Sequence, residues 1–181
     1  MSLTAAEMKV ADLPYLPEYF SRYYFLLDDV PLLDVIQKSI DELKELPLDQ
    51  YRALGDRVYA PGKWTVKDIL QHITDTTRTF TYRALAFARG DKQAMPAFPE
   101  DTFAANAEAN ERSFESLLEE MAIVNQSFKA MFASFTPKML LRGGIGFKGP
   151  YTVASIGFTL PGHQRWHFGM IRDRYFPLLE Q

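Results

Sequence analysis

The sequence contains no cysteine. This absence excludes disulfides, thiolate nucleophiles, Cys-ligated zinc and iron–sulfur clusters from the chemistry of the chain. Histidine is scarce as well, because only His72, His163 and His167 occur among the 181 residues. Any metal site must therefore be built from these imidazoles and from carboxylates.

The sequence also lacks an excess of positive charge and a long apolar run. Its 20 Lys and Arg residues stand against 23 Asp and Glu residues, and the formal net charge of −3 gives no electrostatic basis for binding nucleic acid. The sequence contains no run of about 18 apolar residues, the length that a membrane-spanning helix needs. Residues 1–14 include Glu7, Asp12 and Pro14, where a secretion signal needs an unbroken apolar stretch. We expect a cytoplasmic protein that binds neither nucleic acid nor membranes.

The composition that is present is typical of a globular protein. Hydrophobic residues make up 47% of the chain and charged residues 24%, far from the profile of disorder. A chain of this length can bury one ordinary core. We predict a single domain over residues 1–181, in which residues 1–16 form an irregular N-terminal segment.

Four segments with helical periodicity, separated by breaks rich in Pro and Gly, predict an all-α fold. The first covers residues 17–46 and is interrupted at Pro31. The second covers residues 65–90 and opens at Thr65-Val66-Lys67-Asp68, which resembles a capping box. The last covers residues 152–175.

The third segment has the most regular pattern, because its members recur at alternating steps of four and three. This spacing is typical of helices in a bundle and predicts one helix over residues 103–135. Asn110 is the only polar member of the stripe, and it is either a buried amide satisfied by its neighbours or a pocket wall near a metal. The stripe consists of Phe103, Ala107, Asn110, Phe114, Leu117, Met121, Val124, Phe128, Met131 and Phe135.

The connection before the last helix is dense in glycine. It contains a formal G-x-G-x-x-G at Gly144, Gly146 and Gly149. A dinucleotide-binding fingerprint must follow a strand and open a helix, whereas this segment follows a long helix and runs into Pro150. The pattern therefore predicts a flexible turn or a short hairpin.

The three histidines form the one constellation that indicates chemistry. His163 and His167 lie one turn apart on the apolar face of the last helix, and two imidazoles at this spacing can bind one ion. His72 borders the apolar stripe of the second helix, and neighbouring helices of a bundle bring such positions together. A lone histidine in an apolar stripe is usually a neutral core residue. Because all three lie on or beside such stripes, the pattern favours a metal site.

The residues around the histidines exclude two common types of metal enzyme. Gln164 occupies the position at which a zincin protease carries its general-base Glu. No Glu-x-x-His motif occurs, although ferritin-like di-iron sites require it. A site of two histidines and one carboxylate stays open if Asp68 or Asp75 replaces His72, although both point away from the core stripe.

Two segments resemble the signatures of the DinB-like (YfiT-type) family of metal-dependent hydrolases and thiol transferases. They are Pro61-Gly62-Lys63-Trp64-Thr65-Val66-Lys67-Asp68-Ile69-Leu70-Gln71-His72-Ile73 and Gly162-His163-Gln164-Arg165-Trp166-His167. The resemblance extends over roughly residues 17–175, and Arg83 also matches. The three metal ligands of the family correspond to His72, His163 and His167.

The resemblance implies an antiparallel four-helix bundle with a three-histidine metal site, often as a homodimer. Some relatives are transferases or isomerases that use small cellular thiols, and others are described as hydrolases. The second signature departs from the common Gly-His-Glu-x-His-His form at Gln164 and Trp166. Neither residue is a ligand. Because position 164 lacks the glutamate, a proposal that this position transfers protons is weakened.

We therefore expect an enzyme in which one divalent ion, Zn or Ni, activates water or a small thiol co-substrate against a small-molecule substrate. Three neutral histidines leave such an ion at least one open coordination position, which is the arrangement of catalytic sites. Asn110, Arg83 and Tyr24 are candidate pocket residues. The alternative is a non-catalytic bundle that holds the metal as a binding or scaffold module, and it predicts a closed site or no accessible cavity.

Overall fold

Helix α4 (Val66–Ala88) begins at the predicted capping box in the computed structural model, which describes residues 3–93, 96–146 and 148–180. The Thr65 Oγ1 accepts a hydrogen bond from the Asp68 amide at 3.1 Å, and the Asp68 carboxylate accepts one from the Thr65 amide at 3.0 Å. The helix stops ahead of Gly90, whose φ of 92° lies in a region that favours glycine. Both predicted ends of this helix are confirmed.

Helix α8 (Val153–Arg174) follows a two-stranded hairpin of β1 (Gly143–Gly146) and β2 (Gly149–Thr152). The strands are antiparallel, and Gly143 pairs with Thr152. Glycine is required at Gly146, because a Cβ there would lie 1.7 Å from the ring of Tyr151. A hairpin is one of the two structures that the glycine-dense sequence predicts, and the last helix begins where predicted.

The first predicted helix is divided into short pieces at its prolines. Pro31 and Pro47 each precede a helix and supply the fixed φ that suits a helix start. A first 3-10 turn covers Val10–Asp12, ahead of the predicted helix. Within residues 17–46 the pieces are α1 (Ser21–Tyr24) and α2 (Leu32–Asp41), with 3-10 turns at Glu18–Phe20 and Glu42–Glu45, and α3 (Leu48–Leu54) follows Pro47. The predicted irregular segment 1–16 contains only a turn and the first of these 3-10 helices over its described part, and residues 1 and 2 lie outside the described residues.

The third predicted helix is not continuous, so the prediction of one helix over residues 103–135 is wrong. Asn110 is exposed rather than buried, and Phe103 is 46% exposed. A residue with positive φ, Glu108 at 51°, breaks the chain direction, and the Ser113 Oγ then caps a new helix by accepting from the Ser116 amide. The segment forms α5 (Glu100–Asn106), a 3-10 turn at Ala109–Glu111 and α6 (Phe114–Ala133), followed by α7 (Pro137–Leu140); a last 3-10 turn, Phe176–Glu180, follows α8.

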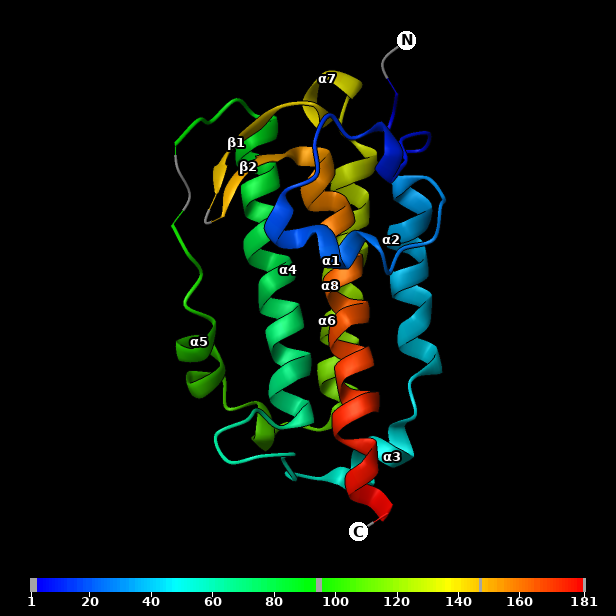
Figure 1. Cartoon of the computed structure of the whole chain (residues 1–181), viewed down its shortest axis with the longest axis vertical. Helices are drawn as coiled ribbons and strands as arrows, with labels where there is room; N and C mark the ends of the chain where they lie inside the picture. Colours follow the sequence, from blue (N-terminus) through cyan, green and yellow to red (C-terminus); the bar gives the residue numbers. More distant parts are fainter. Residues whose placement is uncertain (1–2, 94–95, 147, 181) are drawn as a thin grey trace.

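Helices α2, α4, α6 and α8 form a four-helix bundle, as predicted (Figure 1). Helices α2 and α8 run in one direction and α4 and α6 in the other, so each helix has one parallel and one antiparallel neighbour. The parallel pair α4 and α6 requires a long crossover, and residues 96–113 run back along the bundle and include α5. None of the described helices is both long and apolar enough to cross a membrane.

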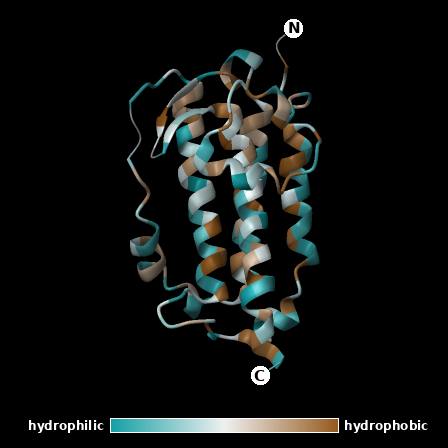
Figure 2. Cartoon of the chain, viewed as in Figure 1, coloured by the Kyte–Doolittle hydropathy of each residue, from teal (hydrophilic) through white to brown (hydrophobic). Residues whose placement is uncertain are grey.

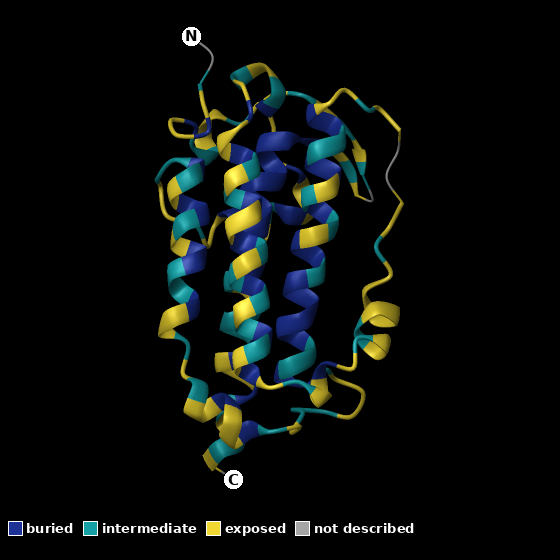
Figure 3. Ribbon diagram, turned by 180° about the vertical axis from the view of Figure 1, so that it is seen from behind, coloured by how far each residue is buried: buried dark blue, intermediate teal, exposed yellow. Residues whose placement is uncertain are grey.

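The bundle core has two apolar clusters with a polar layer between them. The helices are amphipathic, with apolar and polar positions alternating along each ribbon (Figure 2), and the buried positions face inward (Figure 3). On α6, Asn125 lies between Met121 of one cluster and Phe128 of the other. The buried polar residues of the layer include Ser39, His72, Thr76, Thr77, Asn125, His163 and Gln164.

A buried amide pair ties three helices together within this layer. The Asn125 Nδ2 donates to the Gln164 Oε1 at 3.0 Å, and the Gln164 Nε2 donates to the carbonyl oxygen of Ser39 at 2.8 Å. Gln164 therefore links α8 to both α6 and α2. Gln164, at the position where a zincin protease has its general-base Glu, thus forms hydrogen bonds that connect three helices of the bundle.

Replacement of Asn125 by leucine removes one bond of this pair. Asn125→Leu leaves the Gln164 Oε1 without its buried donor, and we expect the free energy of unfolding to fall by about 1–3 kcal/mol. Urea denaturation measures this change. Gln126→Leu, at an exposed neighbouring position, is the matched control and is expected to change stability little. Equal stabilities of the two variants would contradict the assigned role of the pair.

Candidate metal site

The three histidines come from two antiparallel neighbours, α4 and α8. His72 lies in the second turn of α4, and His163 and His167 lie one turn apart on α8. The hydroxyl of Tyr175 donates to the carbonyl oxygen of Trp64, which fixes the end of α8 against the start of α4. This pairing brings the histidines of both helices to the same level of the bundle.

The Nε2 atoms of the three rings converge. The His163 Nε2 lies 3.2 Å from the His72 Nε2 and 3.0 Å from the His167 Nε2, and one ligand atom from each ring lies within 4.8 Å of the others. Nitrogen ligands about 2.0–2.1 Å from a tetrahedral ion would lie about 3.3 Å apart. The observed spacing therefore fits one bound ion.

Burial keeps all three imidazoles neutral. Loss of solvent lowers the pKa of His72 to about 4 and that of His167 to about 3. The pKa of His163 is lowered well below its usual value by burial and by the two neighbouring histidines. Neutral imidazole is the form that binds metals, so the rings are in the ligating state at neutral pH.

Hydrogen bonds among the three rings cannot satisfy all of their nitrogen atoms. A neutral imidazole has one N–H, and the Nδ1 atoms of all three rings are buried without a hydrogen-bond partner among the described residues. The single Nε2 of His163 can serve only one of its two close neighbours, as donor or as acceptor. A cation at the centre satisfies all three lone pairs together, so the donor set fits a metal.

The alternative carboxylate ligands are engaged elsewhere. Asp68 serves in the capping box, and its second oxygen accepts from the Asn110 Nδ2 at 3.0 Å. Asp75 accepts from the Gln71 Nε2 at 3.0 Å. Within the described part of the chain, neither belongs to the cluster that could hold an ion, which consists of the three histidines.

Aromatic rings surround the histidines. The Trp64 ring centre lies 4.7 Å from that of His72, and the Phe98 ring centre lies 6.3 Å from it with an interplanar angle of 10°. The Tyr23 ring meets His163 edge-on at 5.4 Å. Phe98 comes from the crossover, so this segment covers one side of the site.

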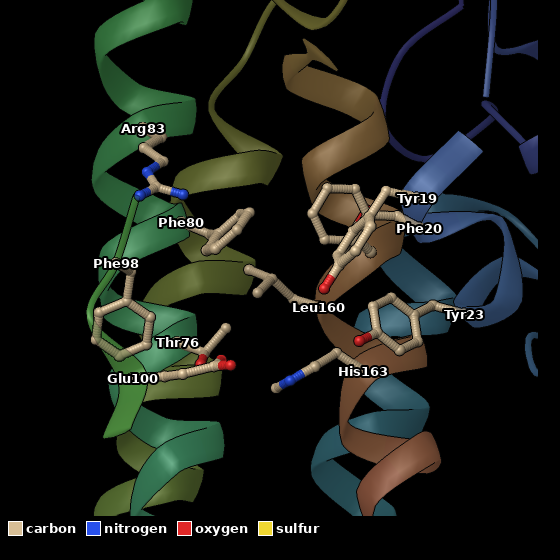
Figure 4. A pocket seen from close by; sticks show the side chains of 11 residues that line it. Tyr19, Phe20, Tyr23, Thr76, Phe80, Arg83, Phe98, Glu100, Leu160 and His163 are labelled. Carbon is tan, nitrogen blue, oxygen red and sulfur yellow. The ribbon is translucent and has the colours of Figure 1, made fainter. Parts of the chain in front are cut away.

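A pocket of about 130 Å³ opens next to His163 (Figure 4). The Glu100 carboxylate and the His163 imidazole point toward one another across it. The buried Thr76 Oγ1, which has no hydrogen-bond partner among the described residues, belongs to another side chain that lines the pocket. The lining residues are Tyr19, Phe20, Tyr23, Thr76, Phe80, Arg83, Phe98, Glu100, Thr159, Leu160 and His163.

The three candidate pocket residues have different positions. Arg83 lines the pocket. Tyr24 is buried beside it, where its hydroxyl pairs with the Thr159 Oγ1 at 3.0 Å, and it is not among the lining residues. Asn110 lies on the surface and joins the start of α4 through Thr65 and Asp68.

Sequence reasoning missed Glu100 and Phe98, which the crossover brings to the pocket. Both follow or flank prolines in a segment without helical periodicity, so no pattern in the sequence indicates that they face the histidines. Tyr23 was also missed, although it belongs to the aromatic segment before Pro31. Trp64 lies within the Gly-Lys-Trp signature, which could have indicated a contact with His72.

A family model for the DinB superfamily matches residues 32–171, a range that begins with α2 and includes all three histidines. The chain belongs to the DinB superfamily. No protein of curated function matches the sequence.

Among solved structures, the DinB superfamily chain is similar to YfiT from Bacillus subtilis, described as a probable metal-dependent hydrolase with an unusual four-helix bundle topology. The TM-score is 0.69 at 16% sequence identity, and the match covers 81% of this chain and 85% of YfiT. At this identity the likeness shows a shared fold.

A metal held by the folded protein alone stabilises the fold by mass action. Chelation of the metal-loaded protein is expected to lower the melting temperature by about 5–10 °C, if free metal exceeds its dissociation constant about 100-fold. His167→Ala should abolish this difference. Differential scanning calorimetry with and without chelator measures it.

Asn125→Leu is the control for this experiment. It weakens the same layer without touching a histidine, so it should retain the chelator-dependent shift at a lower melting temperature. A wild-type melt that chelator leaves unchanged would contradict metal binding.

Proposed function

We propose that this DinB superfamily chain is a metal-dependent enzyme in which His72, His163 and His167 hold one Zn or Ni ion. The observation that carries the proposal is the convergence of three neutral imidazoles beside a pocket. When bound, such an ion supplies Lewis acidity that lowers the pKa of water or of a thiol. The substrate is a small molecule that enters the pocket, and the nucleophile is water or a small thiol.

Glu100 is the proton-transfer group of this proposal. Its carboxylate points toward His163 across the pocket, and burial together with the nearby Asp101 raises its pKa. A raised pKa suits a group that both accepts and returns a proton near neutral pH. Glu100 accepts the proton of the nucleophile as the new bond to the substrate forms, and it returns the proton to the leaving group as the old bond breaks.

The remaining pocket residues orient the substrate and exclude water. Burial raises the pKa of Tyr23 to about 12, so its hydroxyl stays protonated and can donate to charge that develops near His163. Phe80, Phe98 and Leu160 line the pocket with apolar surface. This apolar lining strengthens the electrostatic contacts inside it.

The scaffold alternative predicts a closed site or the absence of a cavity. The pocket beside His163 favours the enzyme instead, because a substrate can reach the ligand set. Hydrolysis and thiol transfer remain two versions of the same proposal. They share the ligands and differ in the nucleophile.

A panel of small thiols assayed with metal-loaded protein separates the two versions. Turnover of activated esters or amides without thiol supports hydrolysis, and turnover of electrophilic substrates only with an added thiol supports transfer. Glu100→Gln is expected to lower turnover by about 100-fold at unchanged metal content, because it removes the proton acceptor.

Glu119→Gln makes the same change at an exposed position of α6 and serves as the control. Its turnover should match that of the wild type. Absence of turnover with every thiol and without any thiol would overturn the enzymatic proposal and leave the scaffold.

The predicted homodimer is supported by apolar side chains on the surface near the N-terminal region. Phe25 is 84% exposed, and Leu26 and Trp166 line one shallow groove next to it. Phe25→Ser is expected to convert a dimer into a monomer, whereas Ile123→Ser, at an exposed position of α6, should not. Light scattering measures the molar mass, and a monomeric wild-type protein would contradict this proposal.

A further inference from the structure

Arg83 is a buried cation that forms no ion pair with the carboxylates of the described residues. The residue is only 4% exposed, and its guanidinium lies 4.5 Å from the centre of the Phe80 ring. The Nη2 donates to the carbonyl oxygen of Pro96 at 2.6 Å. Among the described carboxylates, none forms an ion pair with it. A charge removed from water in this way is costly unless a counter-charge compensates it.

The guanidinium of Arg83 belongs to the pocket that contains His163. In Figure 4 it lies at the end of the pocket away from His163. Thr76, Phe80 and Arg83 lie on one face of α4, and the helix rises about 10 Å between the first and the last of them. A ligand atom that reaches Arg83 is therefore well separated from one that reaches the histidines.

We propose that Arg83 binds the carboxylate of the substrate, which is an organic monoanion with an apolar or aromatic body. The planar guanidinium matches a carboxylate in two parallel hydrogen bonds. In Figure 4 the ring of Phe80 lies between Arg83 and His163, and Phe98 lines the pocket on the crossover side, so both rings can contact the body of such a molecule. Glu100 shares the pocket, and its negative charge disfavours a dianion such as a phosphate monoester.

One part of this proposal rests on the proposed function, namely that the reacting bond lies at the end of the substrate near His163. Anion binding by Arg83 itself needs no metal. Metal-dependent catalysis and anion binding by Arg83 can therefore be tested separately. Binding to chelated protein tests anion binding without the metal.

The test compares phenylacetate with its neutral isostere phenylacetamide by isothermal titration calorimetry. Wild-type protein, chelated to remove metal, is expected to bind phenylacetate at least about tenfold more tightly than the amide. Arg83→Met should remove this preference, and Arg83→Lys should restore only part of it. Arg89→Met makes the same charge change at the exposed C-cap residue of α4 and should leave the preference intact.

Equal binding of acid and amide by the wild type would overturn the proposal, whether or not the Arg83 variants fold. A preference for the acid that appears only in metal-loaded protein and survives Arg83→Met would also overturn it, because the carboxylate would then bind at the histidines. Metal content, measured in parallel, reports on the proposed function. Protein purified without chelator that contains no metal, yet shows the Arg83-dependent preference, would support the subsite and contradict the metal enzyme.

Discussion

The candidate site depends on three neutral imidazoles that converge where no described residue forms a hydrogen bond with their Nδ1 atoms. One ligand nitrogen from each ring approaches the same point, and burial disfavours protonation of the rings. A bound cation would compensate the repulsion between lone pairs directed at this point. The two apolar clusters above and below hold α4 and α8 in register, so the polar layer between them is fixed by surrounding packing.

The parallel placement of α4 and α6 has a consequence for the site. Because the chain must return along the bundle between them, the crossover passes over the pocket and brings Phe98 and Glu100 to the histidines. Arg83 holds this segment through the carbonyl oxygen of Pro96. An up-and-down bundle with short loops would leave the same face of α4 open to solvent, without a carboxylate opposite His163.

The parts of the fold that the sequence predicts are those with local signals. The capping box at Thr65 and the spacing of His163 and His167 depend only on residues within one or two helical turns. They can therefore be predicted without knowledge of the tertiary structure. The prediction of one helix over residues 103–135 was wrong because the spacing of apolar residues continues by coincidence on both sides of Glu108. At Glu108 the backbone adopts a left-handed conformation that ends the helix. Glu100 could not be placed, since its position depends on the direction of α6 and not on its neighbours in sequence.

With Gln164 at the position where the family signature commonly has glutamate, the proposed mechanism assigns proton transfer to the crossover rather than to α8. A carboxylate at position 164 would have to take the place of an amide that donates to Ser39 and accepts from Asn125, and a carboxylate cannot donate to a carbonyl. In this chain the buried amide serves the bundle instead. The acid–base group of the proposed mechanism then comes from a segment that shares its pocket with Arg83, so opposite charges stand at the two ends of one cavity and give an anionic substrate a single favourable orientation.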